Sequence, residues 1–184
     1  MQRELEGTEG RRVRVYTHHG SVEGLLRTNS GVSTMHYLNV AASTNPFLTL
    51  RPPLACSQDW MFDDAALALS MDSILFVTEL SEYLPRPGDP REASRFQRVP
   101  IRLRLADFVV DGHIHVPNGS NPIHRLNQDR HPFIALTVVS VMGPEQQFAT
   151  SFLAANRRYI TAVQQIIGEL EAPKETDALE HARS

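Results

Sequence analysis

Cysteine is nearly absent from the sequence, since Cys56 is the only one in 184 residues. A single cysteine excludes an internal disulfide framework and suits a reducing compartment. Residues 1–12 are charged and have no apolar core, so they do not resemble a signal peptide. No apolar run approaches the roughly 18 residues that a membrane helix needs. These absences predict a cytoplasmic protein with no membrane segment.

Overall basic charge and catalytic motifs are also lacking. The net charge is -3 and the pI is near 6.2, so the chain lacks the basic footprint of a non-specific nucleic-acid binder. It contains no G-x-S-x-G elbow, Walker loop, dinucleotide fingerprint or H-E-x-x-H helix. The sequence therefore predicts a protein that is not an enzyme, with no catalytic residue and no cofactor.

What the sequence does contain is one small β unit repeated twice. An offset of 88 residues relates Val13 to Ile101, Val15 to Leu103, Gly24 to Gly112, His36 to His124 and Asn39 to Asn127. An offset of 86 then relates Phe47 to Phe133, Ala68 to Ala154, Ile74 to Ile160 and Val77 to Val163. Because a one-residue slip would reverse the faces of a strand, this maintained register indicates an internal duplication.

Each copy shows five short alternating segments separated by Gly, Asn or Pro turns. In copy one the expected strands are 13–17, 21–26, 46–50, 65–69 and 74–80, and the segments around His36 and His124 are expected to be turns. Gly24 and Gly112 lie inside strands, where glycine usually marks a bulge or a bend. Closing five strands into a barrel would remove exposed edges. We therefore expect an all-β fold of two tandem five-stranded antiparallel barrels.

Composition divides the chain into five parts. Residues 1–12 are expected to form a flexible N-terminus, 13–80 repeat 1, 81–98 a linker, 99–167 repeat 2, and 168–184 a flexible or loosely helical tail. The linker assignment rests on three prolines and a glycine within residues 81–90. Domains as short as these repeats are marginal alone, so the copies are expected to pack against each other or another chain.

The order of these features resembles a known family. A strand, a turn, a strand with an internal glycine, and then Leu38-Asn39 or Leu126-Asn127 is similar to the first signature block of Sm-like (Lsm and Hfq-related) barrels. Residues 156–163 are similar to the second block, a polar turn before a short apolar strand. The resemblance covers 13–80 and 99–167, and it is closest to bacterial Sm-like domains without an established activity.

The resemblance implies where a ligand would bind. In Sm proteins the asparagine of the first block helps to bind an RNA base, and an Arg-Gly pair in the second block shapes the same pocket. This chain has no such pair, but copy two has Asn156-Arg157 at the matching place. The candidate ligand-binding residues are therefore His36, Asn39, His124, Asn127, Arg157 and Arg158. Copy two is the better candidate for single-stranded RNA.

The histidines allow more than one interpretation. His36 and His124 recur in both copies, so each either holds a tight loop by hydrogen bonding or contacts a ligand. His113 and His115 share a strand face, as zinc ligands can. They face solvent if Ile114 and its alternating neighbours point inward, and no cysteine or carboxylate pair completes a set. We expect no metal site.

Charge is distributed unevenly between the copies. Repeat 1 has three Arg against six Asp and Glu, a net charge of -3, and repeat 2 has six Arg against four, a net charge of +2. Arginine suits bidentate contacts with phosphate or carboxylate. These residues either form ordinary solvated faces or let the basic second copy dock on an acidic first copy, of the same molecule or of a neighbour.

One acidic and aromatic stretch, residues 59–64, has no counterpart in copy two. Its large apolar side chains, Trp60, Met61 and Phe62, either form a partner-binding patch or pack against the barrels. Taken together, the sequence predicts a non-enzymatic binding or scaffolding protein that acts through protein–protein interaction or self-assembly. The alternative is a single-stranded RNA-binding protein that uses repeat 2, and a third option is a small ligand held between the copies.

Overall fold

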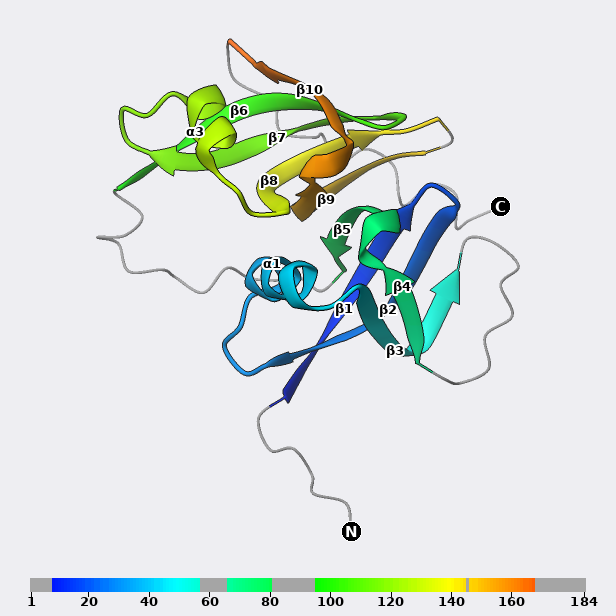
Figure 1. The fold of residues 1–184 in the computed structure, drawn as a ribbon. Helices are drawn as coiled ribbons and strands as arrows, with labels where there is room; N and C mark the ends of the chain where they lie inside the picture. Colours follow the sequence, from blue (N-terminus) through cyan, green and yellow to red (C-terminus); the bar gives the residue numbers. More distant parts are fainter. Residues whose placement is uncertain (1–7, 57–65, 81–94, 145, 168–184) are drawn as a thin grey trace, which may run out of the picture.

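A computed structural model of the chain describes residues 8–56, 66–80, 95–144 and 146–167. These residues form one antiparallel sheet of ten strands in the order β10-β6-β7-β8-β9-β5-β1-β2-β3-β4 (Figure 1). The strands are β1 (Thr8–Thr17), β2 (Gly20–Asn29), β3 (Phe47–Cys56), β4 (Leu67–Ser70), β5 (Ile74–Glu79), β6 (Phe96–Leu105), β7 (Phe108–Pro117), β8 (Phe133–Met142), β9 (Gln147–Asn156) and β10 (Ile160–Gln165).

The two halves of the chain carry the same elements at the expected offsets. Strands β1 and β2 match β6 and β7 at 88 residues, and β3 and β5 match β8 and β10 at 86. Even the single 3-10 turns match, η1 (Met71–Ser73) and η2 (Arg157–Tyr159). The all-β class is therefore confirmed, and each expected strand of copy one overlaps an observed strand, although residue 65 lies outside the described residues. Strand β1 begins at Thr8 and β6 at Phe96, each before the boundary expected for its repeat.

The expectation of two closed barrels is wrong, because the sheet is open. Closing repeat 1 would require its outer strands, β4 and β5, to pair with each other. Instead β5 pairs with β9 of repeat 2, at Phe76 with Ala155, Val77 with Ala154 and Thr78 with Leu153. This pairing joins the two five-stranded units into one sheet and leaves β4 and β10 at its opposite ends (Figure 1).

The expected turns around His36 and His124 are in fact helices, α1 (Thr34–Thr44) and α3 (Pro122–Gln128). Each begins behind a polar N-cap: Ser33 Oγ accepts from His36 N at 3.2 Å, and Asn121 Oδ1 accepts from His124 N at 3.0 Å. Each also buries a leucine, Leu38 in α1 and Leu126 in α3. The caps and this burial explain why the segments are helical.

The glycines inside strands, Gly24 and Gly112, lie where the strand pairing changes register, as expected. The pairing of β2 with β3 changes register between Glu23 and Leu25. A Cβ placed on Gly24 would lie 2.7 Å from Leu54 Cδ2 and 3.0 Å from Leu50 Cβ. Only glycine therefore lets β3 approach β2 this closely.

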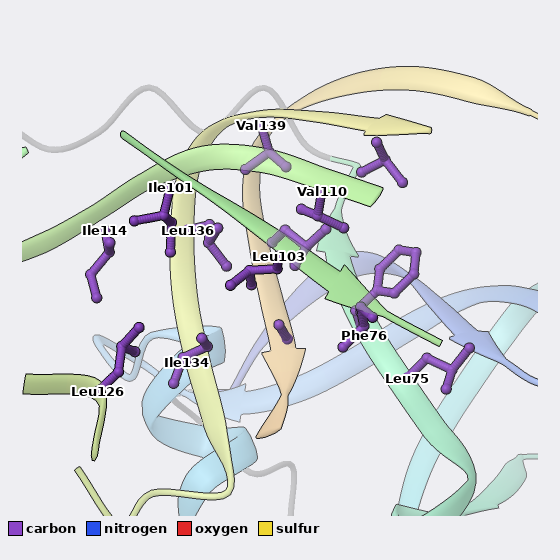
Figure 2. Close-up of a cluster of buried hydrophobic side chains, with 14 of the residues drawn as sticks. Leu75, Phe76, Ile101, Leu103, Val110, Ile114, Leu126, Ile134, Leu136 and Val139 are labelled. Atoms are coloured by element: carbon purple, nitrogen blue, oxygen red, sulfur yellow. The ribbon is translucent and has the colours of Figure 1, made fainter. Parts of the chain in front are cut away.

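The core consists of two clusters of buried side chains that extend across the boundary between repeats. Leu75 and Phe76 of β5 pack with repeat 2 side chains such as Ile101, Leu103 and Leu136 (Figure 2). In the opposite direction, Phe133 and Ala154 of repeat 2 belong to the repeat 1 cluster, together with side chains that include Val13, Val15, Leu38, Leu48, Ile74 and Val77. The two repeats therefore share their hydrophobic cores.

We predict that Gly24→Ala destabilises the fold, because the added Cβ would force Leu54 and Leu50 apart. The expected loss in the free energy of unfolding is about 1–3 kcal/mol, measured by urea denaturation. Gly10→Ala is the matched control, since the nearest atom to its added Cβ would be Leu25 Cδ2 at 4.0 Å. An equal loss in both variants would contradict the packing explanation.

Candidate functional site

The candidate residues on α1 lie at the boundary between the repeats. Asn39 Oδ1 accepts a hydrogen bond of 2.9 Å from Phe133 N, at the start of β8. His36 is exposed on the same helix, in a shallow hollow of about 560 Å³ that is also lined by Asn39 and by His131 of repeat 2. The amide of Asn39 therefore connects repeat 1 to repeat 2, a contact that links residues 94 positions apart.

The matching residues on α3 are exposed. His124 Nε2 lies 2.8 Å from Gln128 Nε2 on the same helix, and the side chain of Asn127 makes no hydrogen bond within the described ranges. Asn127 and Leu126 line a hollow of about 280 Å³ between α3 and the edge strand β10. Asn39 and Asn127 thus hold equivalent positions in the two repeats but differ in what they contact.

The two arginines predicted to bind a ligand make internal contacts. Arg157 donates to the carbonyl end of α3, to Leu126 O at 2.7 Å and to the carbonyl of the C-cap residue Asp129. Arg158 Nη1 lies 2.6 Å from Asp72 Oδ1 in repeat 1, and the neighbouring Tyr159 hydroxyl donates to Asp72 O. Arg157 therefore anchors α3, and Arg158 connects η2 with η1. Their predicted role in ligand binding stays a prediction.

Asn156 is a boundary residue that sequence reasoning did not single out. Its buried amide donates to Ile74 O at 2.8 Å and accepts from Arg158 N at 3.1 Å. The buried amide of Asn156 therefore links a carbonyl at the start of β5 with a backbone N–H of η2. The only sequence signal was its place just before Arg157 in the second block of the resemblance.

Aromatic stacking adds to the same boundary. The buried ring of Tyr16 in β1 stacks on Phe76 at a centroid distance of 4.3 Å and on Phe148 of β9 at 5.4 Å. Phe108 of β7 meets Tyr16 edge to face at 6.2 Å. Burial raises the pKa of the Tyr16 hydroxyl. These rings hold the repeats in one relative position.

The strand histidines and Cys56 form no metal-binding or reactive group among the described residues. Ile114 and Val116 are buried and His115 is exposed, as expected from strand alternation, while His113 is half buried. No group of three or more His, Cys, Asp or Glu among the described residues could hold a metal ion. Burial raises the pKa of the Cys56 thiol, which disfavours the reactive thiolate. Trp60, Met61 and Phe62 lie outside the described residues.

Comparisons of the chain with protein-family models, curated proteins and solved structures find no match. Within the described ranges no helix is long and apolar enough to cross a membrane. A function for this chain can therefore be argued only from the geometry of the described residues. The most distinctive feature of this geometry is a boundary between two similar units, made by strand pairing, an asparagine amide and an ion pair. Among the described residues, β4 and β10, the counterparts of the paired strands β9 and β5, have no further strand beside them.

We predict that Asn39→Ala and Asn127→Ala differ in their effect on stability. Removing the Asn39 amide leaves the part-buried Phe133 N–H without its acceptor, which should lower the free energy of unfolding by about 1–2 kcal/mol. Asn127→Ala changes an exposed residue and should cost less than about 0.5 kcal/mol. Urea denaturation at low micromolar concentration tests both. Equal losses would show that the contact between the repeats contributes little.

Proposed function

We propose that this chain is a non-enzymatic scaffolding protein that associates with other protein chains by strand addition at the free edges of its sheet. The observation that supports the proposal is the pairing of β9 with β5, which is itself strand addition between two similar units. Strands β4 and β10 occupy the equivalent edge positions at the two ends of the described sheet. Unpaired edges of this kind recruit further strands.

The outer face of β10 carries backbone groups in the correct orientation for such pairing. Ile166 N donates inward to Pro100 O at 3.0 Å, so Gln164 also faces inward by strand alternation. The N–H groups of Val163 and Gln165 then point outward, away from β6. Val163 is the counterpart of Val77, which lies at the middle of the β5–β9 pairing.

The resemblance to Sm-like barrels is compatible with this proposal. Barrels of that family associate through strand edges, and two fused units already contain one such association. The RNA-binding alternative has less support from the described contacts. Of its repeat 2 candidates, Arg157 and Arg158 already bond within the chain, whereas His124 and Asn127 are exposed. Association through strand edges is therefore the function that we favour.

We predict that the wild-type protein self-associates and that Val163→Pro reduces this association. Proline removes one of the two outward N–H groups of β10 but leaves the inward hydrogen bonds to β6 intact. Light scattering across a concentration series should show a mass that rises for the wild type and stays at one chain for the variant. Val163→Thr, which keeps both the N–H and the β-branched shape, is the matched control and should associate like the wild type.

Two results would contradict the proposed mode of association. One is a wild-type mass of a single chain at every concentration and in low salt. The other is a Val163→Pro variant that is folded, as judged by circular dichroism, and that associates as well as Val163→Thr.

A further inference from the structure

We propose that a cleft between the two helices binds a small aliphatic α-amino acid, with the ligand carboxylate on Arg125 and the ligand ammonium on Asp129. The cleft has a volume of about 280 Å³ and is lined by residues of α1, α3, β7 and β8. Helix α1 belongs to repeat 1 and the other three elements to repeat 2, so the cleft lies at the boundary between the repeats. The site is independent of association through strand edges and goes beyond the proposed function.

The base of the cleft is apolar. Ile114 of β7, Leu126 of α3 and Ile134 of β8 are buried together at one end of the repeat 2 core (Figure 2). Met35 of α1, which is half buried, adds a further apolar side chain from repeat 1. None of these four side chains carries a hydrogen-bond donor or a strong acceptor, so this surface suits the hydrocarbon part of a ligand.

Two side chains of opposite charge stand beside this apolar base. Arg125 and Asp129 both line the cleft, and their spacing of four residues places them on the same side of α3. No hydrogen bond or ion pair joins the two side chains within the described ranges. An α-amino acid carries its carboxylate and its ammonium on one carbon atom, so a single ligand can pair with both groups.

Each of these two groups keeps free bonding capacity. Asp129 Oδ1 accepts from His131 N at 3.0 Å and lies 2.6 Å from His131 Nδ1, whereas Oδ2 makes no hydrogen bond to the described residues. The exposed guanidinium of Arg125 makes none to them either. Burial alone would raise the pKa of Asp129, but hydrogen bonds from His131 and the charge of Arg125 lower it, which favours the carboxylate. Asp129 Oδ2 can therefore accept from an ammonium group.

The balance of charge in the cleft favours a zwitterion over a simple anion. His115 also lines the cleft, and burial, together with the charges of Arg98 and His113, lowers the pKa of its imidazole, which favours the neutral form. The charges that remain are one guanidinium and one carboxylate. A ligand with a negative charge alone would leave Asp129 without a partner and would be repelled by it, whereas a zwitterion pairs with both groups.

The charged pair is specific to repeat 2. At the offset of 88 residues, repeat 1 has Tyr37 in place of Arg125 and Ala41 in place of Asp129. Helix α1 therefore forms without this pair, so the pair is not a requirement of the helix. Sites for small molecules typically have volumes of about 300–1,000 Å³, and a cleft slightly smaller than this suits a compact ligand such as leucine.

Nuclear magnetic resonance titration of the full chain with leucine and its analogues tests the class of ligand. Leucine should shift the side-chain resonances of Met35 and His115. Isocaproate lacks the amino group of leucine and isoamylamine lacks its carboxylate, so each should bind about tenfold more weakly, as expected when one charged contact is lost. Free glycine, which lacks the hydrocarbon part, should also bind more weakly than leucine.

Three variants test the residues of the cleft. Arg125→Gln and Asp129→Asn should each weaken leucine binding about tenfold. Asp129→Asn keeps an oxygen that can accept from His131 N, so it removes the charge and preserves this contact at the end of α3. Ala135→Leu adds volume inside the cleft, keeps both charges, and should also reduce binding.

A matched control and a change in selectivity distinguish direct contact from an effect on the fold. Arg104→Gln also removes an exposed guanidinium, but Arg104 pairs with Val109, at the opposite end of β7 from His115, so this variant should bind leucine like the wild type. Arg125→Gln should bind leucine no more tightly than isoamylamine, and Asp129→Asn should bind it no more tightly than isocaproate. A purely structural effect would weaken all three ligands alike.

Three outcomes would overturn the inference. Leucine that shifts no resonance of the cleft would show that the amino acid does not bind there. Equal affinities for leucine and isocaproate would show a simple anion site. Equal leucine binding by Arg125→Gln and Arg104→Gln would show that the guanidinium of α3 does not hold the carboxylate. None of these results bears on strand-edge association, which the mass measurements test separately.

Discussion

The pairing of β5 with β9 is the contact on which the rest of this structure depends. Neither repeat is a complete unit without it, because repeat 1 lacks a cover for its core until Phe133 and Ala154 arrive from repeat 2. Repeat 2 in turn packs against Phe76 and Leu75. A five-stranded unit of this size buries little apolar surface alone. Because β5 pairs with β9, each core contains side chains from both repeats, which increases the buried apolar surface. The same pairing fixes the repeats relative to each other.

Equivalent positions of the two repeats hold different residues, and these residues make different contacts. Glu79 is 9% exposed and accepts from Thr34 Oγ1 and from Arg11, which ties the start of α1 to β5. Repeat 2 has Pro122 and Gln165 in place of Thr34 and Glu79. Repeat 1 thus contains a buried polar network that repeat 2 lacks, in keeping with a helix that must support a neighbouring unit.

Much of the fold could be predicted from the sequence, since alternation and turn residues determined the strands and the repeat offsets matched the observed elements. The helices were missed because α3 spans only Pro122–Gln128 and α1 contains β-branched and polar residues that weaken its periodic pattern. Barrel closure could not be decided, because alternation is the same whether β5 pairs with β4 or with β9. The role of Asn39 depended on Phe133, a contact that no local pattern encodes.

The covalent joining of two units in one chain has a thermodynamic consequence. The β5–β9 contact forms within a single molecule, so its effective concentration is set by the intervening chain and does not fall on dilution. Dilution should therefore weaken any contact between separate chains but leave the contact between the two repeats unchanged.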